Sequence, residues 1–209
     1  MKLYLSSIDV PTPDDLAKLL GRSLGDTKVA VIPNAQDYYS ERARSFTNRA
    51  FATEMESLGL KVETVDLRDY SDGSTLKTKL EGFDLIWARG GNTFCLRYEM
   101  RRSGFDDILN DLLESGIVYG GDSAGALVAG MSIGGIESAD IPEFSVEVIK
   151  EGLNIVPYVV LPHVGNHEFA QAVATVKELH KSKREVIELK DNEAVIFEGN
   201  KHWIVTAEE

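Results

Sequence analysis

The stretch from Ile117 to Ala129 constrains the fold more than any other part of the chain. It begins as a short apolar run, continues as Gly-Asp-Ser-Ala-Gly, and ends in small and apolar residues. A strand that turns sharply into a helix around a serine has this order, which is that of a nucleophile elbow. Gly121 and Gly125 flank Ser123 because a Cβ at either position would collide with the adjoining strand or helix. The pentapeptide alone is equally compatible with a glycine-lined turn that has no chemical role.

Apolar runs typical of strands alternate with stretches typical of helices. Strands are predicted at 2–6, 28–33, 61–65, 83–88, 117–119 and 159–161, and helices at 13–24, 41–58, 75–80, 94–100, 105–115 and 167–181. This alternation predicts an α/β fold with a mostly parallel sheet and helices on both faces. Short strands at 186–189, 194–197 and 203–206 would finish the sheet with an antiparallel edge. Because no linker or repeat interrupts the pattern, residues 1–209 are expected to form a single domain.

Two loops of this sheet are expected to meet. Functional loops in parallel α/β sheets gather at the carboxyl ends of the strands. The run Gly90-Gly91-Asn92-Thr93 follows the predicted strand that ends at Ala88, and the elbow follows the one that ends at Tyr119. We therefore expect the glycine pair to lie beside Ser123.

Composition excludes several classes of partner. The formal net charge of −12 disfavours nucleic acid or an anionic membrane as a partner, since both require a basic face. Cys95 is the only cysteine, which excludes an intramolecular disulfide and a four-thiolate metal site. No stretch is apolar for long enough to suggest a signal peptide or a membrane anchor, so a cytoplasmic location is expected.

A serine nucleophile needs a base to take its proton, and four histidines are available. His163 follows an apolar strand that should end at the same edge of the sheet as Ser123, which makes it the preferred base. His167 is the competitor. His180, in the polar end of a helix, and His202, beside a Gly-Asn turn, are expected at the surface.

The histidine in turn needs a carboxylate to fix its tautomer. Asp140 is preferred and Glu137 is second, because both lie in the glycine-rich loop between elbow and histidine. An oxyanion hole needs two convergent N–H donors. The amide of Ala124, directly after the serine, is one candidate, and the amide of Gly91 is the other.

Three motifs together resemble the peptidase E family of serine peptidases: Gly90-Gly91-Asn92-Thr93-Phe94, Gly121-Asp122-Ser123-Ala124-Gly125 and Pro162-His163. The resemblance covers nearly the whole chain. It implies a flavodoxin-like three-layer sandwich similar to class I glutamine amidotransferases. It also implies Ser123 as nucleophile, His163 as base, Asp140 of Asp140-Ile141-Pro142 as the third member and Gly91 in the oxyanion hole.

The sequence departs from the aspartyl dipeptidases of that family in two places. They carry an arginine after the catalytic histidine, associated with binding an N-terminal aspartate, whereas Val164 to Val176 contains no Lys or Arg. Asp122 stands where the dipeptidases have tryptophan. A preference for N-terminal aspartate is therefore doubtful, although Arg89 could substitute. Cyanophycinases share the elbow, which leaves an amide of another acidic substrate open.

The sequence therefore predicts a cofactor-independent serine peptidase acting on short peptides, with no metal. An esterase of the α/β-hydrolase fold is disfavoured because only forty positions separate Ser123 from His163. A glutamine amidotransferase is disfavoured because the elbow holds serine. A binding module without catalysis remains the alternative from another class. The sequence does not distinguish a monomer from a homodimer.

Overall fold

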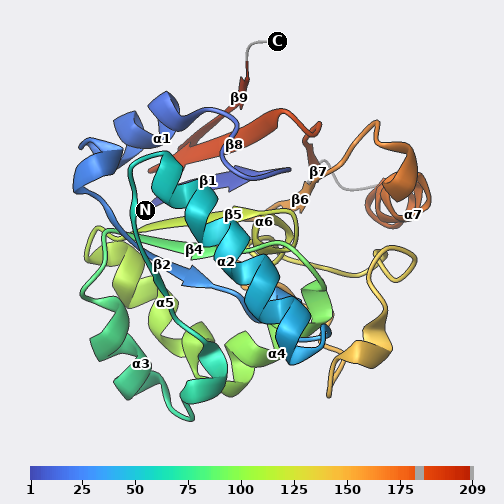
Figure 1. Cartoon of the computed structure of the whole chain (residues 1–209). Coiled ribbons are helices and arrows are strands. Elements are labelled where there is room, and N and C mark those ends of the chain that lie inside the picture. Colours follow the sequence, from blue (N-terminus) through green and yellow to red (C-terminus); the bar gives the residue numbers. More distant parts are fainter. Residues whose placement is uncertain (182–185, 208–209) are drawn as a thin grey trace.

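The computed structural model describes residues 1–181 and 186–207. Its main sheet contains seven strands in the order β3-β2-β4-β5-β1-β8-β9 (Figure 1). These strands are β1 (Lys2–Ser6), β2 (Lys28–Ile32), β3 (Lys61–Thr64), β4 (Leu85–Ala88), β5 (Val118–Asp122), β8 (Glu193–Glu198) and β9 (Lys201–Thr206). The first five strands pair in parallel, whereas β8 pairs antiparallel with β1 and β9 antiparallel with β8. The predicted α/β class, parallel centre and antiparallel edge are confirmed.

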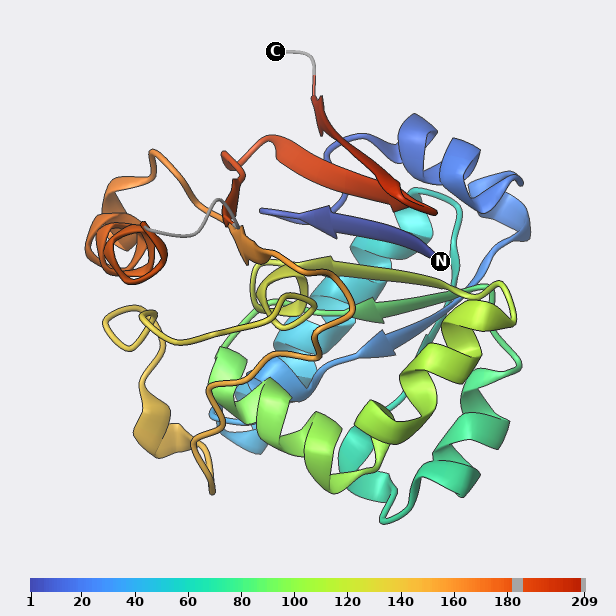
Figure 2. The same ribbon diagram turned by 180° about the vertical axis from the view of Figure 1, so that it is seen from behind.

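Helices cover both faces of this sheet. The α-helices are α1 (Pro13–Leu20), α2 (Glu41–Ser57), α3 (Gly73–Leu80), α4 (Thr93–Arg102), α5 (Phe105–Glu114), α6 (Ala124–Leu127) and α7 (Ala170–His180). Short 3₁₀ turns are η1 (Leu24–Asp26), η2 (Asn34–Gln36), η3 (Leu67–Asp69), η4 (Pro142–Phe144) and η5 (His167–Phe169). Helices α1 and α2 lie over one face (Figure 1), and α3, α4 and α5 lie over the other (Figure 2).

The alternation of side chains along the strands explains these layers. In β1, Tyr4 packs with the cluster that contains Leu16 of α1 and Phe51 of α2. Its neighbours Leu3 and Leu5 point the opposite way, into the larger cluster with α3, α4, α5 and α6. Successive side chains of a strand alternate between faces, so each central strand contributes to both layers of core.

Two predictions about the elements were wrong in detail. Helix α1 ends at Leu20 rather than Leu24, because Gly21 adopts a left-handed conformation (φ 71°) and closes the helix through bonds to carbonyl oxygens of its last turn. The strand predicted at 186–189 does not join the main sheet. It forms β7 (Val186–Glu188), which pairs in parallel with β6 (Val159–Leu161) in a separate two-stranded sheet.

The described residues contain no helix that is long and apolar enough to cross a membrane.

Candidate active site

The elbow at Ser123 has the geometry that its glycines predict. Ser123 adopts φ 48° and ψ −108°, a conformation that L residues rarely take and that places its side chain on a sharp turn after β5. A Cβ on Gly125 would lie 1.8 Å from the carbonyl oxygen of Ala88, and a Cβ on Gly121 would lie 2.6 Å from the carbonyl carbon of Gly125. Only glycine fits at both positions, as predicted. Helix α6 has only four residues, and the amides of Ala126 and Leu127 donate to the carbonyl oxygen of Ser123.

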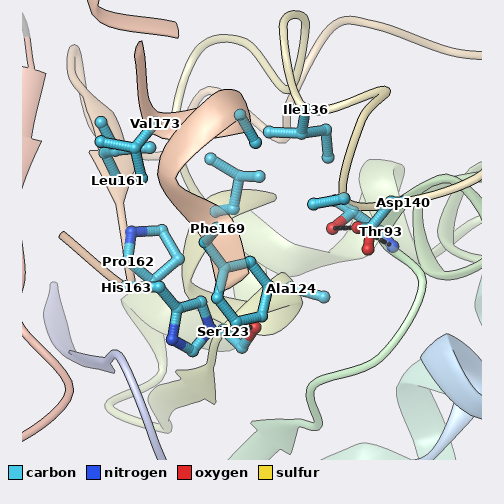
Figure 3. Close-up of a pocket in the computed structure, with 13 residues that line it drawn as sticks. Thr93, Ser123, Ala124, Ile136, Asp140, Leu161, Pro162, His163, Phe169 and Val173 are labelled. Carbon is cyan, nitrogen blue, oxygen red and sulfur yellow. Dashed lines mark hydrogen bonds between the residues drawn. The ribbon is translucent and has the colours of Figure 1, made fainter. Parts of the chain in front are cut away.

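His163 reaches the serine from the end of β6. Its Nε2 lies 2.9 Å from the Oγ of Ser123. The imidazole stacks on the ring of Phe169, with 4.1 Å between the ring centroids and 16° between the planes (Figure 3). His163 itself adopts φ 62°, so its backbone turns sharply directly after the strand. The structure thus brings together the two residues that the sequence singled out as nucleophile and base.

The carboxylate that contacts His163 is Asp191, which the sequence analysis did not consider. Its Oδ1 lies 2.7 Å from Nδ1 of His163, and its Oδ2 accepts a hydrogen bond of 2.8 Å from the side-chain amide of Asn166. Burial raises the pKa of Asp191, but the hydrogen bonds from His163 and Asn166 outweigh it, so the pKa lies below the usual range. Asp191 is therefore held ionised beside the imidazole.

Ser7, directly after β1, connects the histidine to this carboxylate. The backbone N–H of His163 donates to the Oγ of Ser7 over 2.8 Å, and the Ser7 hydroxyl lies 3.3 Å from Oδ1 of Asp191. Ser7 is fully buried. Its hydroxyl therefore fixes the backbone of the histidine and donates to the carboxylate at the same time.

The prediction that Asp140 or Glu137 orients the histidine is corrected by these contacts. Asp140 accepts hydrogen bonds from the backbone N–H and the hydroxyl of Thr93, at the start of α4. Glu137 is paired with Lys150 over 2.8 Å and accepts from a backbone N–H in its own loop. The prediction assumed that the acid lies between serine and histidine in the sequence, whereas Asp191 follows both.

A signal for Asp191 was present in the sequence. It lies in the turn between two predicted short strands, 186–189 and 194–197. Because β8 runs antiparallel to β1, with Ala194 opposite Ser6, β8 starts at the edge where the parallel strands end. The polar turn that precedes β8, and with it Asp191, therefore lies beside the elbow.

The other histidines lie away from the serine. His167 is exposed in η5 and His202 is exposed on β9. His180 is buried at the end of α7, so the prediction that it lies at the surface was wrong. Val176, one turn earlier in α7, is also buried, so both residues lie on the face of the helix that packs against the core.

The two predicted oxyanion donors flank Ser123. Gly91 lies with Ser123 in one hollow, and Ala124 lies with it in the adjoining pocket. Gly91 has φ 141°, and a Cβ there would lie 2.4 Å from the carbonyl oxygen of Ala35. Among the described residues, the N–H groups of Gly91 and Ala124 have no hydrogen-bond acceptor.

Asp122 supports the glycine loop from the side of the sheet away from the pocket. Its two carboxylate oxygens accept hydrogen bonds from the indole N–H of Trp87 (2.7 Å) and the backbone N–H of Gly90 (3.0 Å). Burial raises the pKa of Asp122 to about 6, although both hydrogen bonds oppose the increase.

The pocket beside Ser123 is mainly apolar (Figure 3). Among the described residues, Asp140 is the only Asp, Glu, Lys or Arg in its lining. The adjoining hollow, which Tyr38 and Phe144 border, is lined by no Lys or Arg of the described part of the chain either. Arg89, proposed above as a substitute cation, instead donates to Asn48 and lies over the ring of Phe51 on α2. Neither hollow thus offers an acidic substrate a cationic side chain from the residues that the structure describes.

Within the described ranges, no three His, Cys, Asp or Glu side chains are grouped so that they could hold a metal ion. His163 and His167, at a spacing that could suit zinc, are separated because one is buried against Ser123 and the other is exposed.

Comparisons with known proteins identify the family to which the chain belongs. The sequence profile of peptidase family S51 matches residues 6–205. The chain is 33% identical to the uncharacterized peptidase Lmo0363 of Listeria monocytogenes over 69% of this chain and 71% of that one. It is also 33% identical to peptidase E of Actinobacillus pleuropneumoniae, over 65% of this chain and 53% of the relative.

Among solved structures, the chain resembles a Listeria monocytogenes protein that its name assigns to peptidase E, with a TM-score of 0.80, 26% identity and 98% of both chains covered. A peptidase from an acI-B1 actinobacterium shares the fold, with a TM-score of 0.73 and 18% identity over 98% of this chain and 87% of that one. The family match spans far more than half of the sequence. The protein therefore belongs to peptidase family S51, the peptidase E family, and is a serine-type peptidase.

Proposed function

We propose that the protein hydrolyses short peptides through a Ser123–His163–Asp191 triad and an acyl-enzyme intermediate. The observation that carries this proposal is the unbroken path of two hydrogen bonds, 2.9 Å from Ser123 Oγ to His163 Nε2 and 2.7 Å from His163 Nδ1 to Asp191 Oδ1. A serine hydroxyl next to a base that a carboxylate orients is the arrangement that activates serine nucleophiles.

The reaction follows from the positions of these atoms. Ser123 Oγ attacks the carbonyl carbon of the scissile bond while His163 Nε2 takes the hydroxyl proton, and Asp191 stabilises the imidazolium that forms. The oxyanion is bound by the free amides of Gly91 and Ala124. His163 then protonates the leaving amine and the C–N bond breaks. Water attacks the ester with His163 again as base, which releases the acid and restores the Ser123 hydroxyl.

The lining of the pocket argues against a preference for N-terminal aspartate. A buried carboxylate in a substrate requires a cationic partner or several donors. No Lys or Arg within residues 1–181 and 186–207 lines the two hollows that contain Ser123, and Arg89 faces α2. Uncharged peptides are therefore the expected substrates.

Replacement of Ser123 by alanine tests the mechanism. Because triad members act as a unit, we expect the turnover of a susceptible peptide to fall by about 10⁶, and His163→Ala to cause a loss of similar size. Hydrolysis of a dipeptide mixture is followed by mass spectrometry, with Ser57→Ala, an exposed serine at the end of α2, as the matched control. Substantial hydrolysis by Ser123→Ala would contradict the mechanism. Peptide binding without turnover in the wild type would favour a binding module.

A further inference from the structure

The peptide that joins Gly90 to Gly91 is held at one end by a buried side chain. The carbonyl oxygen of Gly90 accepts a hydrogen bond from the side-chain amide of Gln36, the last residue of η2. The backbone N–H of Gly90, in the preceding peptide, donates to Asp122 over 3.0 Å. Within the described residues, the N–H of Gly91 has no acceptor. The C=O of this peptide is thus bonded to the protein, whereas its N–H is left for a ligand.

The bond to Gln36 also fixes the direction of the Gly91 N–H. A trans peptide is planar, and its C=O and N–H point in opposite directions. Gly91 and Ser123 line the same hollow, whereas Gln36 lies outside its lining. Gly90 packs directly on the nucleophile, because a Cβ on it would lie 3.1 Å from the Cβ of Ser123. With the carbonyl directed at Gln36, the N–H of Gly91 is directed at the hollow beside the serine.

Two adjacent glycines make this peptide easy to reverse. Glycine lacks a Cβ and adopts φ of either sign at little cost, and Gly91 has φ 141°. A reversed peptide would direct the carbonyl oxygen of Gly90 at the hollow in place of the Gly91 N–H. A partial negative charge would then face the oxyanion that forms when Ser123 attacks. A donor to this carbonyl from outside the hollow opposes the reversal.

Gln36 is itself fixed in place. It is buried, and its side-chain oxygen accepts from the hydroxyl of Thr47 over 3.4 Å, so its NH2 group faces the glycine pair. The turn that carries it is anchored by Asn34, whose side chain donates to Asp37 and to Asp66 over 2.8 Å each. The donor therefore has a fixed position relative to the peptide that it holds.

We propose that Gln36 is a positioning residue, which holds the Gly90–Gly91 peptide so that the Gly91 N–H binds the oxyanion formed on attack by Ser123. Gln36 acts through the peptide and does not touch the substrate. This inference deepens the proposed function and rests on it.

The test compares the binding of leucinal with that of leucinol, which has the same side chain but no carbonyl, by titration calorimetry. With leucinal, Ser123 Oγ bonds to the aldehyde carbon, its proton passes to His163, and the π electrons of the C=O move to the oxygen, which the hole binds. We expect wild type to bind leucinal more tightly. In Gln36→Met this advantage should fall by about tenfold to a hundredfold, since loss of a whole oxyanion donor costs about 10²–10³.

Leucinol binding should not change in Gln36→Met, so the ratio of the two dissociation constants separates positioning of the hole from a general loss of structure. Gln36→Leu, which also lacks the donor, repeats the test if the methionine variant does not fold. Gln171→Met is the matched control, because Gln171 is the only other glutamine of the chain and is exposed on α7.

A wild-type ratio in folded Gln36→Met or Gln36→Leu would overturn the inference. Equal weakening of leucinal and leucinol would overturn it in favour of a role in the shape of the pocket. Failure of the proposed function would already appear in the wild type, as equal binding of the two ligands and the same behaviour in Ser123→Ala, and would overturn the inference with it.

Discussion

Asp191 and Asp140 are two carboxylates near the same serine, and their surroundings differ. Asp191 accepts hydrogen bonds from His163 and Asn166, and its pKa is lowered although burial opposes this. Asp140 accepts only from Thr93, and burial raises its pKa. The comparison teaches that distance from the nucleophile along the chain does not assign a role. The donors around each carboxylate do, and they favour Asp191 as the partner of the histidine and place Asp140 with the start of α4.

The largest difference between the two should appear on substitution by asparagine. Asp191→Asn presents an amide to Nδ1 of His163 and favours the wrong tautomer, so kcat should fall by about 10⁴. Asp140→Asn keeps an oxygen that can accept both bonds from Thr93, so kcat should fall by less than about tenfold. Steady-state kinetics on leucyl-alanine measures both. A greater loss of kcat in Asp140→Asn would reverse the assignment.

Ser7 contacts His163 and Asp191, so its substitution tests the role of Asp191 separately from that of Asp140. Ser7→Ala removes the acceptor of the His163 backbone N–H and a donor to Asp191. We expect kcat to fall by at least about tenfold, because both hydrogen bonds are lost, with KM little changed. The same kinetic assay measures it, with Ser57→Ala as control. A rise in KM at constant kcat would instead place Ser7 in substrate binding.

The smallest effect is on stability as a function of pH, and it should have opposite signs for the two carboxylates. The folded-state pKa of Asp191 is lowered, so its contribution to stability is present above the ordinary aspartate pKa of 3.8 and is lost as the pH falls. The folded-state pKa of Asp140 is raised, so its contribution is present below 3.8 and is lost as the pH rises through the folded-state value.

Urea unfolding of the wild type and both asparagine variants across this range measures the effect. The stability advantage of the wild type over Asp191→Asn should grow with pH, whereas its advantage over Asp140→Asn should shrink. If the stability difference changed with pH in the same way for both variants, the pKa values of the two carboxylates would not be shifted in opposite directions by folding.

Local patterns predicted most of the fold and two of the three residues of the proposed triad. The elbow was predictable because Gly121 and Gly125 leave one backbone path around Ser123, and His163 because it follows an apolar strand. The meeting of the glycine loop with the elbow is confirmed by the pairing of β4 with β5, which places Ala88 opposite Gly121.

The remaining features could not be predicted because they depend on strand pairing between distant parts of the chain. Whether the strand at 186–189 joins the main sheet depends on its partner, and that partner, β6, is 25 or more residues earlier in the chain. The position of Asp191 depends on the antiparallel pairing of β8 with β1, at the opposite end of the sequence. Asp140 was predicted as the acid from its loop and from the family resemblance, neither of which reveals that Thr93 binds its carboxylate.

The rate at which a fluorophosphonate labels Ser123 tests the central claim most directly, because it reports activation of the serine without a peptide substrate. Intact mass and peptide mapping follow the wild type, Asp191→Asn and Asp140→Asn, with Glu137→Gln as control. We predict a single adduct on Ser123 in the wild type and far slower labelling of Asp191→Asn than of Asp140→Asn. Rapid labelling of Asp191→Asn together with loss of labelling in Asp140→Asn would contradict the account and return the role of the acid to Asp140.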